Sequence, residues 1–277
     1  MRRLKRLLIR PGAIGDFVVS LPAMECLRGE YLEVWAATPN VPLARFAHRA
    51  RSIASTGLDL LELAEPDPRL LATLLGFDSI ISWYGAKRPE FRDRVAELGL
   101  PFRFFAALPQ DGGGAHAADF YLDQVRSIAN CPSDGVPRIS CPHSSRDRAV
   151  IHPFSGSPKK CWPLERFEDL ARRLADRMPV AWCAGPEDVL PSAVHFADLY
   201  ELACWLASAR IYIGNDSGPT HLAAAVGTPV VALFGPSDPT VWAPRGAHVA
   251  LAAEASLEAI TVDRVESLVY YILGGKS

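Results

Sequence analysis

The sequence predicts an α/β protein built from two mainly parallel sheets, each with helices on both faces. Three observations lead to this prediction. Short apolar runs that suit buried strands alternate with helical patterns through the first half of the chain. The same alternation starts again near residue 149, and residues 131–146 between the halves are rich in turn formers. We therefore expect two Rossmann-like domains with a boundary near residue 146.

Nine apolar runs are expected to form the strands of these sheets. In the first half they are Leu7–Arg10, Leu32–Ala37, Ser52–Thr56, Ser79–Trp83 and Arg103–Ala106. In the second half they are Ala149–Pro153, Val180–Ala184, Arg210–Gly214 and Pro229–Phe234. The closing segment, 261–273, carries apolar residues at helical spacing.

Length, charge and cysteine spacing exclude several classes of function. The 277 residues, 49% of them hydrophobic, can bury a sizeable core, and two domains suit this length. A net charge of −2 gives no general case for nucleic-acid binding. The six cysteines show no CxxC spacing, so neither a zinc site nor a disulfide framework is expected and the thiols should be reduced. The apolar run at residues 7–9 is too short for a signal peptide, which predicts a cytoplasmic protein.

The most informative segment is 214–238. An apolar strand ends at Gly214, Ser217 suits a helix N-cap, and Pro219 suits a first helical turn. Backbone amides at such a helix start are free to bind a phosphate. Asp216, just before the helix, can face a ribose or sugar hydroxyl. The segment therefore predicts a nucleotide-sugar site.

Two further loops follow predicted strands. In the first, Gly12 and Gly15 let the backbone approach a ligand, and Asp16 lies where open α/β sheets bind their ligands. The alternative for Asp16 is that it only caps a helix. The second loop, 153–163, consists of small residues with Lys159 and Lys160 and leads into an amphipathic helix. Together the three loops offer a carboxylate, a lysine and amides, which suit a diphosphate ligand.

These segments resemble glycosyltransferase family 9, the ADP-heptose:lipopolysaccharide heptosyltransferases. The family pattern joins Gly-Asp and Leu-Pro-Ala, Lys-x-Trp-Pro, and Asp-Ser/Thr-Gly-x-x-His-Leu-Ala-Ala ahead of Phe-Gly-Pro-Ser/Thr-Asp-Pro. This sequence supplies them at Gly15–Ala23, Lys160–Pro163, Asp216–Ala224 and Phe234–Pro239. The resemblance runs from residue 7 to near residue 245.

The resemblance implies the GT-B fold, in which two Rossmann-like domains face each other across a cleft. It places the acceptor on residues 1–146 and the donor nucleotide on residues 147–260. By the same analogy, residues 261–277 form a helix that packs back on the N-terminal domain. It also implies an inverting, metal-independent transfer of a heptose-type sugar from an ADP-sugar, without a cofactor, to a lipopolysaccharide-core or related glycan.

Site roles follow from the resemblance and from the chemistry of sugar transfer. Asp16 is expected to act as the base toward the acceptor hydroxyl, and Lys160 to offset the charge of the departing diphosphate. Lys159 is adjacent, and only the register to Trp162 favours Lys160. The expected donor-binding residues are Lys159, Glu187, Asp216, Ser217, Gly218, Pro219, Thr220 and His221. The acceptor-side loop residues are Gly12, Gly15, Lys87 and Arg88.

The expected partners are an ADP-sugar donor and an anionic glycolipid or glycan acceptor, without nucleic acid. Two basic clusters could contact an acidic acceptor or the inner face of the cytoplasmic membrane, and ordinary solvated charge is the alternative. The clusters are Arg2, Arg3, Lys5 and Arg6, and Lys87, Arg88, Arg92 and Arg94. The alternative function is a non-catalytic nucleotide- or glycan-binding module of the same fold.

Overall fold

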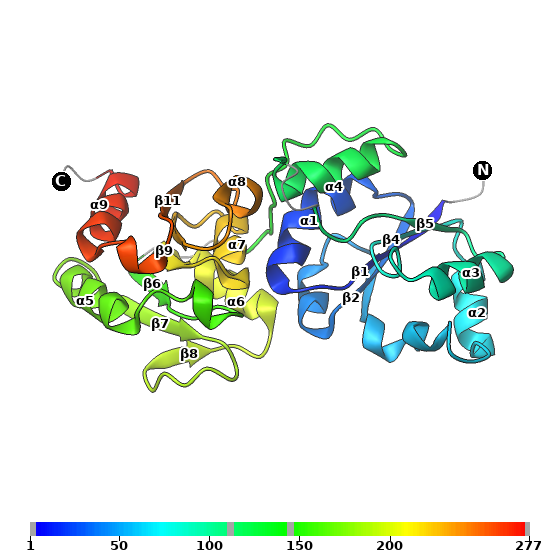
Figure 1. Cartoon of the computed structure of the whole chain (residues 1–277), viewed down its shortest axis with the longest axis horizontal. Coiled ribbons are helices and arrows are strands. Elements are labelled where there is room, and N and C mark those ends of the chain that lie inside the picture. Colours follow the sequence, from blue (N-terminus) through cyan, green and yellow to red (C-terminus); the bar gives the residue numbers. More distant parts are fainter. Residues whose placement is uncertain (1–3, 110–113, 143–146, 275–277) are drawn as a thin grey trace.

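The computed structural model describes residues 4–109, 114–142 and 147–274, which form two α/β halves lying side by side (Figure 1). Each half contains a parallel sheet flanked by helices, as the alternation of strand and helix patterns predicts. The expected boundary at residue 146 lies outside the described residues. The α/β architecture is confirmed.

The first sheet has the strand order β3-β2-β1-β4-β5, and its paired strands are all parallel. Alternate residues of β1 enter different cores, because successive side chains of a strand point to opposite faces. Leu8 packs with α1 and α4, whereas Leu7 and Ile9 pack with α2 and α3. The elements are β1 (Lys5–Arg10), α1 (Ile14–Cys26), β2 (Tyr31–Ala36), β3 (Arg49–Ser52), α2 (Pro68–Leu75), β4 (Ser79–Ser82), α3 (Pro89–Glu97), β5 (Phe102–Phe104) and α4 (Ala117–Arg126).

The second sheet has the order β11-β10-β9-β6-β7-β8, again with parallel pairing. In both sheets the chain adds strands first on one side of its first strand and then on the other, so the strand order switches between β1 and β4 and between β6 and β9. Doubly wound sheets bind ligands at such a switch point. The elements are β6 (Arg148–His152), α5 (Leu164–Ala175), β7 (Val180–Ala184), β8 (Ala193–His195), α6 (Leu199–Ala207), β9 (Ala209–Asn215), α7 (Gly218–Ala225), β10 (Val230–Phe234), α8 (Pro239–Trp242), β11 (Val249–Ala253) and α9 (Val262–Ile272).

The two halves meet through α1 and α7, which lie next to each other at the junction (Figure 1). Their first turns touch at two glycines. A Cβ atom added to Gly218 would lie 2.6 Å from Cβ of Ile14 and 3.3 Å from the backbone nitrogen of Gly15. One hydrophobic core also continues across the junction, from Phe17 in α1 to Leu222 in α7. The N-termini of two helices from different halves are therefore in close backbone contact.

Three expectations about individual elements are wrong. The third strand, β3, ends at Ser52, where the expected strand was to begin, and a 3₁₀ turn at Ile53–Ser55 follows it. Strands β8 and β11 were not expected, because they are short edge strands with half-exposed residues. Helix α9 does not pack on the N-terminal domain: its buried Val265 and Val269 join the core formed by α5 and the second sheet.

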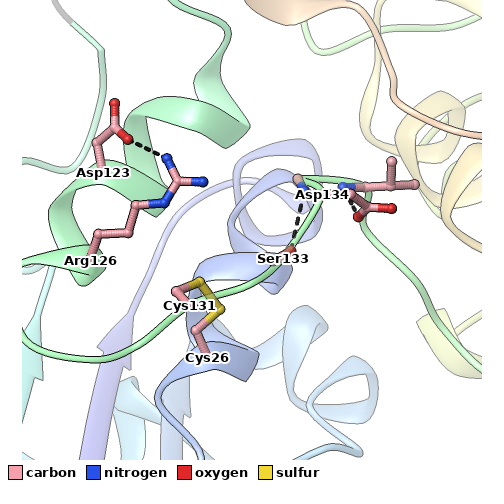
Figure 2. The surroundings of a disulfide bond; sticks show 8 residues. Cys26, Asp123, Arg126, Cys131, Ser133 and Asp134 are labelled. Atoms are coloured by element: carbon pink, nitrogen blue, oxygen red, sulfur yellow. Dashed lines mark hydrogen bonds and ion pairs between the residues drawn. A yellow bond between two sulfur atoms is a disulfide. The ribbon is translucent and has the colours of Figure 1, made fainter.

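The expectation that all thiols are reduced is also wrong. Cys26 at the end of α1 and Cys131 after α4 form a disulfide, with their Cα atoms 5.2 Å apart (Figure 2). The two cysteines are 105 residues apart, so local spacing gave no signal for the pair. Cys141, Cys161, Cys183 and Cys204 are free. None of the helices in the described ranges has the length and apolar character needed to cross a membrane.

Candidate functional site

A pocket of about 420 Å³ lies between the two halves. From the first half it is lined by Ala13, Gly15, Asp16 and Leu108. From the second half it is lined by Ser155, Gly156, Ser157, Lys160, Asp216, Ser217, Gly218, His221 and Trp242. The structure thus brings together the residues that follow β1, β6 and β9, because the carboxyl ends of these parallel strands face the same space.

Asp16 reaches the pocket from the first turn of α1. The N-cap of this helix is Ala13, which makes no side-chain cap, so Asp16 does not act as the N-cap. Gly12 has a φ of +132°, a conformation that favours glycine, and a Cβ there would lie 3.4 Å from the Asp16 carboxylate. Gly12 therefore lets the loop pass close to the carboxylate, although it does not itself line the pocket.

Arg10, which sequence reasoning missed, supports this loop from beneath. Its guanidinium is buried and donates to the carbonyls of Pro11 and Asp16, at 3.1 Å and 3.0 Å, and to the hydroxyl of Tyr121 at 2.8 Å. Burial raises the pKa of Tyr121 to about 12, so its hydroxyl stays protonated and donates to the carbonyl of Ala107. The only signal in the sequence was an arginine at the end of an apolar strand.

Lys160 and Asp216 form an ion pair in the pocket. Nζ of Lys160 donates to Oδ2 of Asp216 at 2.7 Å. The Asp216 side chain is 10% exposed and the Lys160 side chain 39% exposed, so the lysine remains open to a ligand. Lys159 is exposed and lies outside the pocket lining. Of the two adjacent lysines, the structure therefore directs Lys160 toward the pocket.

His221 lines the same pocket as this ion pair, and its Nε2 is 3.9 Å from Oδ1 of Asp216. Burial lowers the pKa of His221 to about 4, which makes the ring neutral near pH 7. The ring also packs across the junction, because a Cβ on Gly15 would lie 3.2 Å from its Cδ2. A neutral imidazole here can donate or accept one hydrogen bond without adding charge.

The turn that leads into α7 is held by side chains that do not line the pocket. Thr220 is buried, and its hydroxyl bonds to the carbonyl of Asn215 and to Ser217. Asn215, another residue that sequence reasoning missed, accepts from the backbone of Trp162 at 2.9 Å and donates to the carbonyl of Pro153 at 2.8 Å. These bonds fix the 153–162 loop to the end of β9 and keep Ser217 and Gly218, at the start of α7, in the pocket lining.

The pocket continues into two adjoining hollows of about 440 and 360 Å³. The first shares Ser155, Gly156 and Gly218 with the pocket and adds Asp188, whose carboxylate accepts from the backbone of Gly185 at 2.8 Å. Pro219 and His152 line both hollows, and the second is otherwise mainly apolar. Together they form one groove along the junction.

The structure leaves six predicted residues outside the lining of this groove: Gly12, Lys159 and Thr220, described above, and Glu187, Lys87 and Arg88. Glu187 is exposed, and its neighbour Asp188 points inward instead. Lys87 is exposed near the start of α3, and Arg88 is tied to Glu62 and to the hydroxyl of Tyr84. The chain turns away from the junction after β4, so these two basic residues are not brought to Asp16.

The other basic cluster also lies apart from the pocket. Lys5 and Arg6 are at the amino end of β1, the opposite end from the pocket, and Arg6 donates to the carbonyl of Leu27. Arg2 and Arg3 fall outside the described residues. Across the ranges that the structure describes, no group of three or more His, Cys, Asp or Glu side chains is arranged to hold a metal ion.

Comparison with known proteins gives a consistent result. The model of glycosyltransferase family 9 (heptosyltransferase) matches residues 115–269, just over half of the chain. Lipopolysaccharide heptosyltransferase 3 of Escherichia coli K12 is 30% identical over 144 residues, which cover 46% of this chain and 42% of that protein. Lipopolysaccharide core heptosyltransferase OpsX of Haemophilus influenzae Rd is 26% identical over 36% of this chain and 33% of its own length. The sequence matches thus span less than half of these relatives.

Solved structures extend the likeness to nearly the whole chain. The Escherichia coli ADP-heptose lipopolysaccharide heptosyltransferase II superimposes with a TM-score of 0.75 at 19% identity over 98% of both chains. Escherichia coli heptosyltransferase WaaC with ADP gives a TM-score of 0.73 at 17% identity, covering 97% of this chain and all of that one. At these identities the likeness establishes the shared GT-B fold.

Proposed function

Because this chain belongs to glycosyltransferase family 9 (heptosyltransferase), we propose that it transfers a heptose-type sugar from an ADP-sugar to a lipopolysaccharide-core or related glycan. One observation carries the proposal beyond family membership. Asp16 of the first half and the Lys160–Asp216 pair of the second half line a single pocket at the junction. A base for the acceptor and a cation for the leaving group thus face the same space.

We place the donor diphosphate at the start of α7. The N-cap of this helix, Ser217, makes no side-chain cap, and its carbonyl accepts from the N–H of Thr220 at 3.2 Å. Pro219 has no N–H, so Gly218 is the first-turn residue whose N–H is left for a phosphate, and the helix dipole favours an anion there. Lys160 is bonded to Asp216, two residues before α7, so its ammonium can replace that bond with one to a phosphate oxygen of the donor. Asp216 would then turn toward a hydroxyl of the donor sugar, and we assign Asp188, rather than Glu187, to the ribose because Asp188 lines the groove.

The proposed reaction inverts the anomeric centre. The acceptor hydroxyl, entering from the side of Asp16, attacks the anomeric carbon opposite the diphosphate while Asp16 takes its proton. The bond from that carbon to the diphosphate oxygen breaks, and ADP leaves with the electron pair. Lys160, the N–H of Gly218 and the dipole of α7 stabilise the charge that develops on ADP, so these groups supply without a metal ion what a divalent cation would otherwise supply.

An activity assay with the purified protein tests this proposal against the alternative of a non-catalytic module. ADP release from ADP-heptose, with a lipopolysaccharide-core acceptor, should depend on both substrates. Asp16→Asn should lower the transfer rate by about 10²- to 10⁴-fold, the range for general-base catalysis, while keeping the affinity for ADP. The matched control is Asp93→Asn, an exposed aspartate on α3, which should leave both values unchanged.

Two outcomes would contradict the proposal. If wild-type protein binds ADP and transfers no sugar to any core acceptor, the protein is a non-catalytic binding module. If Asp16→Asn transfers at the wild-type rate, the base is another group. Contact of the protein with the cytoplasmic membrane remains a prediction from its basic residues alone.

A further inference from the structure

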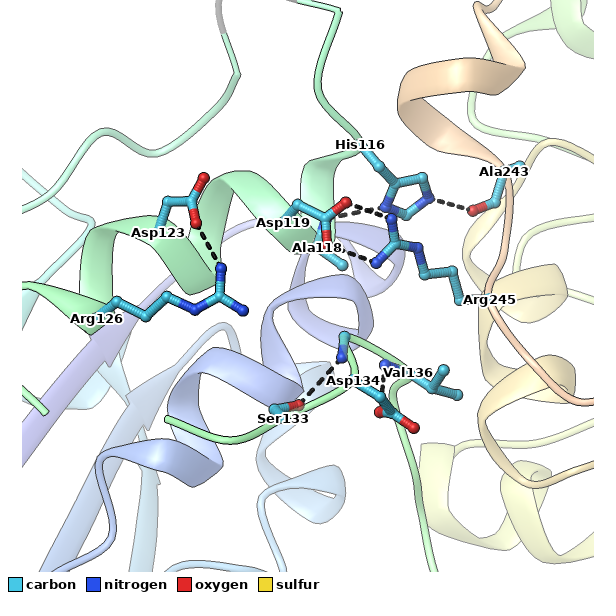
Figure 3. A network of polar contacts seen from close by, with 11 residues as sticks. His116, Ala118, Asp119, Asp123, Arg126, Ser133, Asp134, Val136, Ala243 and Arg245 are labelled. Atoms are coloured by element: carbon cyan, nitrogen blue, oxygen red, sulfur yellow. Dashed lines mark hydrogen bonds and ion pairs between the residues drawn. The ribbon is translucent and has the colours of Figure 1, made fainter. Parts of the chain in front are cut away.

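Three side chains join the start of α4, in the first half, to the loop after α8, in the second half (Figure 3). Both terminal nitrogens of Arg245 donate to the carboxylate of Asp119, at 2.7 Å and 2.5 Å. Nε2 of His116 lies 2.8 Å from the carbonyl oxygen of Ala243. A two-bond pairing of arginine with carboxylate fixes orientation as well as distance. The contact therefore holds the two segments in one relative position.

The hydrogen bonds of His116 define its state. Nδ1 accepts from the backbone N–H of Ala118 at 3.1 Å, so the proton of the neutral ring must be on Nε2, which donates to Ala243. Burial lowers the pKa of His116, which favours this neutral form. The histidine thus caps α4 with one nitrogen and anchors the opposite half with the other.

The segment that connects the two halves passes directly against this contact. Gly135 has a φ of +76°, and a Cβ there would lie 2.5 Å from a terminal nitrogen of Arg245 and 3.2 Å from Asp119. Another residue here would be strained by this φ, and its side chain would displace the guanidinium of Arg245. Three parts of the chain meet here: α4, the connecting segment, and the loop after α8.

The contact has a consequence for the pocket, because Trp242 directly precedes Ala243. Trp242 lines the pocket together with Asp16, although it comes from α8, a helix of only four residues. Such a short helix has little stability of its own. The anchoring of the next residues on α4 therefore keeps the indole at the pocket.

We propose that His116, Asp119 and Arg245 form an interdomain clamp that positions Trp242 over the cleft and holds the donor-side loop against the acceptor half during transfer. This inference rests on the proposed function for its effect on transfer, but the clamp itself can be measured without turnover. The three residues touch no reacting atom, so they are positioning residues. Breaking the clamp should free the loop 239–246 and misplace the donor relative to Asp16.

A charge-swap experiment tests the clamp. Arg245→Asp and Asp119→Arg should each increase hydrogen exchange in residues 239–246 and expose Trp242 to acrylamide, with Trp242→Phe identifying its share of the fluorescence. The double swap should restore both signals toward wild type. The transfer rate should fall roughly 10- to 100-fold in each single variant, as for a misplacement of about 1 Å, and recover in the double variant. If Arg245→Asp does not fold, Arg245→Gln carries the same test.

The matched control is the pair Asp123–Arg126, joined at 2.7 Å on the same helix without bridging the halves (Figure 3). Its swap should change neither exchange nor quenching. Unchanged exchange and quenching in both single clamp variants would overturn the proposal. So would a double swap no better than the single variants. If wild-type protein lacks transferase activity, the proposed function fails, and the exchange and quenching results still decide the clamp.

Discussion

Replacing Gly218 by alanine should separate the two halves at the point where their helices touch. The new Cβ would lie 2.6 Å from Cβ of Ile14, 3.1 Å from its Cγ2, and 3.3 Å from the backbone nitrogen of Gly15. Carbon atoms pack best at about 3.5–4.0 Å, so the shortfall is roughly 1 Å. Two of the three contacted atoms are backbone or Cβ atoms, so no rotamer change relieves the clash. The helices themselves must move apart.

The loss of folding free energy is that of an overpacked site. Overpacking a well-packed site typically costs about 1–3 kcal/mol, and we expect the free energy of unfolding to fall by that amount. The φ of Gly218 is not positive, so alanine causes no backbone strain and the loss reports on the junction. The start of α7 would also move away from Asp16. We place ADP mainly on the second half, so we expect the transfer rate to fall more than the affinity for ADP.

Urea denaturation and ADP titration of Gly218→Ala measure both effects. Gly29→Ala is the matched control, because Gly29 is exposed before β2 and an added Cβ meets only ordinary contacts, the closest at 3.5 Å. It should keep the wild-type urea midpoint and the wild-type transfer rate. A Gly218→Ala variant with both values unchanged would refute the inference that α1 and α7 meet in close backbone contact.

Three further predictions concern single groups. Lys160→Ala should weaken ADP binding about 10- to 100-fold by calorimetry, the worth of one charged hydrogen bond, and an equal loss in the exposed control Lys159→Ala would contradict the assignment. Burial lowers the pKa of His152 to about 4 in the folded protein. Between about pH 6.5 and pH 4 this histidine is therefore protonated in the unfolded chain and neutral in the folded one. Stability should therefore fall as the pH drops from 6.5 to 4, by on the order of 3 kcal/mol from this residue, and denaturation of His152→Gln should show a shallower pH dependence; an identical slope would refute it. Reduction of the Cys26–Cys131 disulfide should cost about 2–4 kcal/mol in urea denaturation, and the Cys26→Ser variant should be insensitive to reductant.

The parts of the fold that the sequence predicted well are those with a strong local signal. Strands β1, β9 and β10 contain apolar runs, Leu7–Ile9, Ile211–Ile213 and Val230–Phe234, because these residues are buried on both faces of a parallel sheet. The edge strand β3 carries polar residues and β8 is only three residues long with two of them exposed, so both lack that signal. Helix α9 was recognised by its spacing, but spacing does not say which sheet its apolar face will cover.

The candidate site divides in the same way. Asp16, Lys160 and Asp216 each follow the carboxyl end of a strand, so parallel sheets alone bring them toward one edge. Which of the adjacent carboxylates, Glu187 or Asp188, lines the groove depends on the path of one loop. Two neighbouring acidic residues in a sequence do not indicate that path. Contacts between distant segments gave no sequence signal at all: Asp119 and Arg245 are 126 residues apart.

Basic residues near a strand end were a weaker guide than carboxylates. Lys87 and Arg88 follow β4 as closely as Asp16 follows β1. The chain then enters α3, which packs on the opposite face of the sheet from α1. Arg10 is the reverse case, because its guanidinium holds the Asp16 loop from inside the core. The role of an arginine was set by what its long side chain could reach, which pattern alone does not show.

A crystal structure of this protein with ADP would show whether the donor and Asp16 share one pocket. We expect the diphosphate at the first turn of α7, with Nζ of Lys160 bonded to a phosphate oxygen in place of Asp216 and with the Asp16 carboxylate across the same pocket. ADP bound away from α7, or with Asp16 and the diphosphate in separate cavities, would contradict it.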